Sequence, residues 1–180
     1  MNSLAHAAAN DYPVCKDEIP GVSKVRFRDN GDGTVTDKVT RLVWQRCDHG
    51  MSIQSDGTCF APGGRKYFDW KQALNEVVTF NQEQSAINKP ATWRLPNIKE
   101  LASIVDMHCA NFAIDLVIFP DPSTTYFSST PIVRVNVQLP PNPLSPTIPF
   151  RQNGAWGISF LTGREVMMGM GETASIRLVK

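Results

Sequence analysis

The sequence predicts one α+β domain with a single antiparallel sheet. Two helical segments with capped N-termini lie in the middle of the chain, and short segments of strand-like alternation lie on both sides of them. Strands gathered at both ends around a helical pair are typical of α+β folds, whereas a regular strand–helix alternation would indicate a parallel sheet. The 180 residues are enough for one domain with a substantial core.

Composition excludes several classes of protein. Apolar residues make up 42% of the chain, which indicates a folded protein rather than a disordered one. The 18 lysines and arginines nearly balance the 17 aspartates and glutamates, so the dense positive field needed for nucleic acid is missing. No stretch reaches the ~18 continuous apolar residues of a membrane span, because Asp115 interrupts the apolar segment 113–119.

Residues 1–22 are expected to be irregular, with Pro13, Pro20 and Gly21 as breaks. The first ten residues lack the basic start and apolar core of an intact signal peptide, but Ala5-His6-Ala7 is of the kind that precedes a cleavage site. Two interpretations stay open: this segment is the end left by signal-peptide cleavage, or it is a disordered tail that carries no targeting information. The folded domain is therefore expected at 23–180.

A hairpin is expected next. Residues 25–28 alternate apolar and polar side chains, 34–36 form a short strand, and 42–45 form another. Between the first two, Asp29–Gly33 contains Asn-Gly and Asp-Gly, both strong hairpin signals. The oxygen-rich stretch Asp29–Asp37 also allows calcium as an alternative, but an EF-hand would place Arg28 and Val39 at ligand positions. A turn explains these residues without a metal.

Two helices follow, each with a capping box. Asp69 and Gln72 begin the first, in which the apolar residues Trp70, Ala73, Leu74, Val77 and Val78 recur at helical spacing. Asn97 and Glu100 begin the second after Pro96, with the expected buried stripe Ile98, Leu101, Ile104 and Val105.

The remainder of the chain reads as strands and loops. Strands are expected at 126–130, 132–137, 155–161, 165–168 and 175–179, with a turn at Gly163. Residues 139–149 contain five prolines, each of which removes a ladder donor, so they are expected to form a long extended loop.

The four cysteines are consistent with two disulfides, for which three connectivities exist. We favour Cys47–Cys59, which would clip a polar surface loop, together with Cys15–Cys109. A zinc site built from Cys47, His49 and Cys59 with His108 or Cys109 is the alternative, although Cys47-x-His49 is not a usual ligand spacing. Free thiols in a reducing compartment are the third interpretation.

Several blocks of sequence resemble a known bacterial family. They are Phe27–Asp37 with Thr40 and Leu42–Gln45, then Thr92–Leu101, and finally 119–120, 126–130 and 176–179. Over about residues 25–180, the chain is similar to the domain-of-unknown-function family 1566, also called the C-terminal domain of the Legionella collagen-like adhesin. It departs from the family pattern at Phe127, where tryptophan is usual, at Arg41, where glycine is frequent, and in the proline-rich loop.

The resemblance implies a C-type-lectin-like fold, with an antiparallel sheet, two flanking helices and a long loop region that carries binding. It also implies a secreted, periplasmic or surface-displayed bacterial protein. The adhesin member of the family binds sulfated glycans and assembles as a trimer, which makes a homo-oligomer one open expectation here. A fold does not fix a ligand, so the ligand itself is not carried over. Within Trp93-Arg94-Leu95-Pro96, we expect Trp93 and Leu95 in the core and Arg94 paired with a carboxylate.

The candidate binding surface lies between Ser123 and Arg164, a stretch without any aspartate or glutamate. A guanidinium suits sulfate, phosphate or carboxylate, and aromatic rings offer flat surfaces to a sugar. The predicted ligand-binding residues are Arg134, Phe150, Arg151, Trp156 and Arg164. The alternative is a solvated loop over an ordinary sheet, with Trp156 in the core.

These features predict a non-catalytic extracytoplasmic recognition domain that binds an anionic glycan or other surface polymer, without a cofactor. A structural module of a pilus, surface fibre or secreted complex is the alternative, because proline-rich segments dock on partners at low entropic cost. A third hypothesis is an enzyme, by analogy with an oxidase branch of the same fold superfamily that relies on reactive cysteines. Two disulfides would leave it no free thiol, and no catalytic motif is present.

Overall fold

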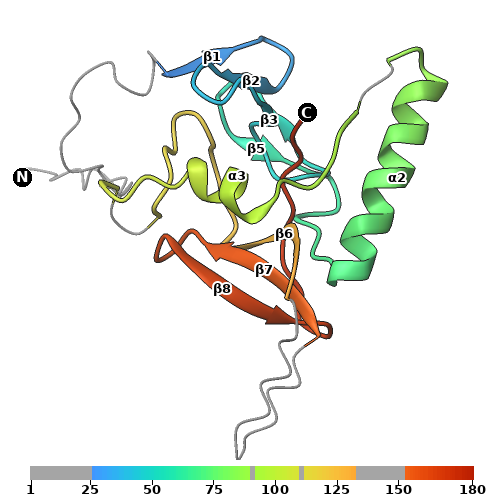
Figure 1. Ribbon diagram of the computed structural model, residues 1–180. Helices are drawn as coiled ribbons and strands as arrows, with labels where there is room; N and C mark the ends of the chain where they lie inside the picture. Colours follow the sequence, from blue (N-terminus) through green and yellow to red (C-terminus); the bar gives the residue numbers. More distant parts are fainter. Residues whose placement is uncertain (1–25, 90–91, 110–111, 133–152) are drawn as a thin grey trace, which may run out of the picture.

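The computed structural model describes residues 26–89, 92–109, 112–132 and 153–180 (Figure 1). These residues form three small antiparallel sheets and two helices, which confirms the α+β class. The first sheet contains β1 (Phe27–Asp29), β2 (Thr34–Asp37) and β3 (Val43–Gln45), and the second contains β4 (Ser52–Ile53) and β5 (Cys59–Phe60). The helices α2 (Trp70–Ala86) and α3 (Ile98–Ser103) precede the third sheet, formed by β6 (Thr125–Pro131), β7 (Gly154–Ser159) and β8 (Arg164–Gly169).

The prediction of a single sheet is wrong, and the C-terminal segment 174–180 explains why. This segment is extended, as expected, but it makes isolated bridges rather than a strand: Val179 pairs with both Trp44 and Arg94, and Ser175 with Tyr126. It therefore lies against β3 at one end and against β6 at the other (Figure 1). Because each neighbour takes only one or two residues, the ladders stay too short to merge into one sheet.

The β1–β2 hairpin forms where the sequence predicts it, with Asp29 opposite Val35. Gly31 and Gly33 have φ of 76° and 82°, which glycine adopts without strain. The turn is closed by its own carboxylates: Gly31 N–H donates to Asp29 Oδ1 at 2.8 Å, and Thr34 N–H to Asp32 Oδ1 at 3.1 Å.

Helix α2 begins with the predicted capping box between Asp69 and Gln72, and only some of its apolar residues face the core. Ala73 is buried, and Trp70, Val77 and Phe80 pack partly against the core. By contrast, the side chains of Leu74 and Val78 are 39% and 56% exposed. Each follows a core-facing residue by one position, which turns it about 100° away from the line of contact. The apolar residues of α2 therefore cover a wider arc than the face that the helix buries.

The β6–β7–β8 sheet separates two apolar clusters. Tyr126 and Ile158, opposite each other in the register, lie on the face that packs with α3, where Leu101 and Ile104 are buried as predicted. The other face carries Phe127, Ala155 and Met168, which pack in the cluster reached by α2. Gly157 lies on β7 opposite Phe127, and a Cβ at this position would come 2.5 Å from the Tyr126 carbonyl oxygen.

A buried ion pair joins the C-terminal segment to the loop after β3. Arg177 and Asp48 are both within 1% of full burial, and Arg177 Nη2 lies 3.0 Å from Asp48 Oδ1. Tyr126 donates its hydroxyl to the same oxygen, and Arg65 Nε lies 2.7 Å from Oδ2. The Arg177 guanidinium also lies 4.9 Å from the ring centroid of Phe119. Burial, the largest effect, raises the pKa of Tyr126, so its proton stays available for Asp48.

Candidate functional site

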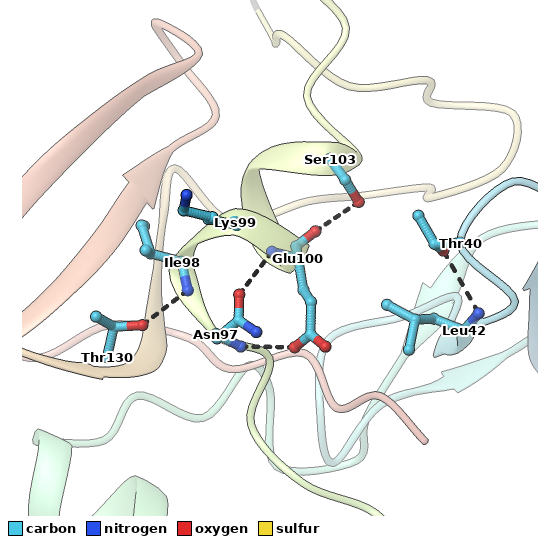
Figure 2. Close-up of a pocket in the computed structure, with 8 residues that line it drawn as sticks. All are labelled: Thr40, Leu42, Asn97, Ile98, Lys99, Glu100, Ser103 and Thr130. Atoms are coloured by element: carbon cyan, nitrogen blue, oxygen red, sulfur yellow. Dashed lines mark hydrogen bonds between the residues drawn. The ribbon is translucent and has the colours of Figure 1, made fainter.

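A shallow pocket of about 540 Å³ lies where the start of α3 meets the turn after β2 and the end of β6. Figure 2 shows Thr40 and Leu42 on one side, Thr130 on the other, and the first residues of α3 between them. The pocket is lined by six residues of polar type and two aliphatic ones, namely Thr40, Leu42, Asn97, Ile98, Lys99, Glu100, Ser103 and Thr130. Three separate parts of the chain therefore build one surface.

The α3 side of the pocket is fixed by a capping box and a bidentate ion pair. Glu100 N–H donates to Asn97 Oδ1 at 2.9 Å, and Asn97 N–H donates to Glu100 Oε2 at 2.8 Å (Figure 2). Arg94 Nη1 and Nη2 lie 2.7 and 2.8 Å from the two oxygens of Glu100. The hydrogen bonds from Arg94 lower the pKa of Glu100 and outweigh the opposing effect of burial. The carboxylate is thus ionised and fully paired.

The opposite side is the turn 37–42, which is held by buried Asp37. Burial, the largest effect, raises the pKa of this carboxyl, but hydrogen bonds from Arg26, Val39 N–H and Thr40 together outweigh it and lower the pKa. Arg26 Nε donates to Asp37 Oδ1 at 3.1 Å, and Thr40 donates to Oδ2 at 2.9 Å. This second carboxylate is also internally neutralised.

The groups that remain unpaired in the pocket are hydrogen-bond donors. Thr130 Oγ1 accepts from Ile98 N–H at 2.9 Å, which leaves its own proton free. Within the described part of the chain, the Asn97 side-chain NH₂ and the Lys99 ammonium have no partner. Arg41, exposed and at φ 67° in the adjoining turn, likewise makes no ion pair with any described residue. The pocket therefore presents excess positive charge and free donors.

Comparison with known protein families shows which family this chain belongs to. The family model of the Lcl C-terminal domain matches residues 33–180, which include both sides of the pocket. The chain belongs to the Lcl C-terminal domain family. No curated protein and no solved structure matches it. The C-type-lectin-like fold therefore stays a prediction, while the α+β architecture is observed.

Two of the five predicted ligand-binding residues of this Lcl C-terminal domain lie on the β7–β8 hairpin. Trp156 is half-buried opposite Met167, and Arg164 is exposed opposite Ser159. Because side chains alternate along a strand, Trp156 and Arg164 point to opposite faces of the sheet. Arg134, Phe150 and Arg151 lie outside the described residues, as does the proline-rich loop, so the predicted surface between Ser123 and Arg164 stays a prediction.

The predicted Cys47–Cys59 disulfide is confirmed, with Cα atoms 5.6 Å apart. The zinc alternative is wrong, because the two cysteines it needs are bonded to each other. Cys15 lies outside the described residues, and its predicted bond to Cys109 stays a prediction. Membership of the adhesin family and this disulfide point to an extracytoplasmic protein. Among the described residues, neither helix has the length and apolar character needed to cross a bilayer.

In the turn considered for calcium, three of the four carboxylate oxygens of Asp29 and Asp32 are engaged. Asp29 Oδ1 and Asp32 Oδ1 accept backbone N–H groups, and Asp29 Oδ2 lies 2.8 Å from Arg46 Nη1. No group of three or more acidic, histidine or cysteine side chains is arranged for a metal in the described ranges. The turn interpretation therefore accounts for these residues.

The pocket beside α3 was not predicted as a site. Arg94, Trp93 and Leu95 do occupy the roles expected from the sequence, the first paired with Glu100 and the others buried. The pocket needs Thr40 and Thr130 to meet Asn97, and these come from distant parts of the chain. One sequence signal pointed to it: if Arg94 pairs with Glu100, the neighbouring Lys99 is left without that carboxylate and is available to a ligand.

Proposed function

We propose that this domain is a non-catalytic recognition domain of a bacterial surface protein and binds an anionic polymer, such as a sulfated or carboxylated glycan. The observation that carries the proposal is the pocket beside α3. Its two nearby carboxylates, Asp37 and Glu100, are neutralised by Arg26 and Arg94, which leaves the charge of Lys99 in excess. Free donors next to excess positive charge suit an anion, because charge-assisted hydrogen bonds are the strong ones.

The shallowness of the pocket supports a polymer rather than an enclosed small molecule. An extended chain can cross an open surface and reach both the pocket and the exposed Arg41 beside it. Recognition without catalysis is supported by the engagement of potentially reactive side chains in structural contacts. Cys47 and Cys59 are joined, and buried His49 is bonded to Glu76 in the body of the domain.

The test is binding to immobilised heparin, with hyaluronate and dextran as carboxylated and neutral comparisons, at about 0.05 M and about 0.5 M salt. We expect binding to heparin that weakens with salt and is unchanged by calcium or a chelator. Lys99→Gln should weaken it by about tenfold, the value of one charge-assisted hydrogen bond. Lys71→Gln, which removes an exposed lysine of α2 away from the pocket, is the matched control.

Arg164→Gln separates the pocket from the surface predicted between Ser123 and Arg164. A loss confined to Arg164→Gln would move the site to the β7–β8 hairpin, and equal loss in all three variants would indicate a diffuse charge effect. No binding to either acidic polymer would overturn the proposal.

An assembly module acting through protein contacts is the second candidate. The exposed Leu74 and Val78, one turn apart on α2, favour it because they give this helix an uncovered apolar strip. Sedimentation velocity on the purified protein tests this idea. An oligomer that dissociates in the Leu74→Ser/Val78→Ser variant, without any heparin affinity, would support assembly over polymer binding.

A further inference from the structure

A second hollow, of about 490 Å³, lies between residues 66–68 and the first half of α2. The lining side chains that matter here are Lys66, Tyr67, Phe68, Asn75, Glu76 and Thr79. It is separate from the pocket beside α3, and the two share no lining residue. Nothing in the polymer-binding proposal depends on it.

Both walls of this hollow are firmly held. Phe68 exchanges two backbone hydrogen bonds with Ala174, at 2.9 and 3.0 Å, and its side chain is buried beneath the hollow. The capping box at Asp69 then fixes where α2 leaves this segment. Trp70 Nε1 donates to the Ser128 carbonyl at 3.0 Å and ties the start of the helix to β6. The backbones of the two walls are therefore both anchored to the body of the domain.

Glu76 is oriented by a buried histidine. His49 Nε2 lies 3.1 Å from Glu76 Oε1, and the imidazole packs edge-on against Phe80 at a centroid distance of 4.8 Å. Gln45 Nε2 lies 3.4 Å from His49 Nδ1, so the amide donates there and the imidazole proton sits on Nε2, facing Glu76. One carboxylate oxygen is thus fixed, while the other has no partner among the described residues.

The neighbouring groups are also free to bind a ligand. The Asn75 side-chain amide and the Lys66 ammonium make no hydrogen bond or ion pair with any residue in the described ranges. Tyr67 is 55% exposed and adds an aromatic surface at the edge of the hollow. The hollow therefore offers an acceptor, an amide that both donates and accepts, a cationic donor and an apolar ring.

This combination matches the chemistry of a sugar ring better than that of an ion. Neighbouring hydroxyls donate and accept at once, which uses Glu76 together with Asn75, and the C–H face of the ring can lie on an aromatic side chain. A simple anion would use only Lys66, and a simple cation only Glu76. Since these two charges offset each other, the hollow has no net charge to attract an ion.

We propose that this hollow is a binding site for an uncharged sugar unit. Glu76 and Asn75 bind adjacent hydroxyls, Lys66 donates to a third oxygen, and Tyr67 supports the ring. The domain would then contact a glycan at two places of different chemistry, with the sugar hollow on α2 and the cationic pocket beside α3.

The test is a titration of the ¹⁵N-labelled protein, followed by amide NMR spectra. The probes are the methyl glycosides of glucose, galactose, mannose and N-acetylglucosamine, each to about 20 mM, which detects a millimolar Kd. At least one should cause saturable shifts in residues 66–68 and 75–79. Glu76→Gln keeps an oxygen for His49 but removes the charge, and it should weaken binding about tenfold, as should Tyr67→Ala.

Glu83→Gln is the matched control, because Glu83 lies about two turns further along α2, outside the hollow. Its affinity for the same glycoside should equal that of the unmodified protein. The absence of saturable shifts with all four glycosides, or shifts confined to other surfaces, would overturn the proposal. So would shifts caused only by methylammonium, which would reassign Glu76 to a cation. Heparin binding measured in parallel reports on the other pocket, so the two proposals fail separately.

Discussion

Arg177 and Asp48 form an ion pair inside the domain although 129 positions separate them in the chain. Both side chains are almost completely buried, and Tyr126 and Arg65 share the same carboxylate. The contact with Arg65 is an ion pair without the alignment of a hydrogen bond. Removing Arg177 would leave the buried Asp48 with only the partly exposed Arg65 as a counter-charge, and breaking a buried pair in this way costs more than the net value of the intact pair.

Arg177→Met should therefore lower the free energy of unfolding by about 3 kcal/mol or more. Arg164→Met, which changes an exposed arginine in the same way, should stay within about 0.5 kcal/mol of the starting protein. Urea unfolding followed by tryptophan fluorescence measures both. Equal losses of unfolding free energy in the two variants would show that the buried arginine contributes no more to stability than an exposed one.

Stability should decline as the solution becomes mildly acidic, because of His49. Burial lowers the pKa of this histidine below its ordinary value of 6.5, and the opposing hydrogen bond and charge of Glu76 do not compensate. Lys66 also lowers the pKa, while Glu83 raises it. As the pH falls below about 6.5, this histidine becomes protonated in the unfolded chain but not in the folded domain. The contribution of neutral His49 to the free energy of unfolding is therefore complete above that pH and decreases below it.

Unfolding curves between about pH 7.5 and pH 5, above the range where carboxyls titrate, would show this decline. His49→Gln should flatten it, whereas His108→Gln should not, because His108 is exposed beside Asp106. A decline that persists in His49→Gln would assign the pH dependence to other groups.

Loss of the Cys47–Cys59 disulfide should destabilise the domain. The bond closes a loop with a sequence separation of 12, for which the chain-entropy account gives about 3 kcal/mol. The Cys47→Ser/Cys59→Ser protein, compared in urea with the starting protein, tests this value. A loss below about 1 kcal/mol would mean that the contacts of Cys59 with Pro120 and Asp121 hold the loop without the bond.

Gly157→Ala should be strongly destabilising, at about 2 kcal/mol or more, because the added Cβ meets the backbone of β6. Gly171→Ala is the natural control, since a Cβ at Gly171 has no atom within 4 Å. Thermal unfolding of the two variants gives the comparison. Similar melting temperatures would show that β6 and β7 can separate enough to admit a methyl group.

Local features of this fold were predictable because their causes are local. The Asn-Gly and Asp-Gly turn, the boxes at Asp69 and Asn97, and the clip between Cys47 and Cys59 each depend on residues close in sequence. Apolar spacing along α2, in contrast, does not fix which face of the helix is buried. Periodicity marks which residues are apolar, but Leu74 and Val78 are exposed because the helix contacts the body along a single line.

The candidate sites were less predictable than the elements that build them. The proximity of Thr40 to Asn97, and of His49 to Glu76, depends on how the three sheets pack together. No local sequence pattern predicts such tertiary contacts. Arg94 shows where sequence reasoning does extend to tertiary structure, since its carboxylate partner is only six residues away.

The bridges made by residues 174–180 affect when the domain can fold during its synthesis. This segment supplies backbone partners to β3, to Phe68, to Arg94 and to β6, and it carries Arg177 into the interior. A nascent chain that lacks it would leave Asp48 without its pair to Arg177 and would leave several strand edges without partners. The domain therefore cannot complete its core during synthesis until these residues emerge from the ribosome. Until then its unpaired strand edges are open to aggregation.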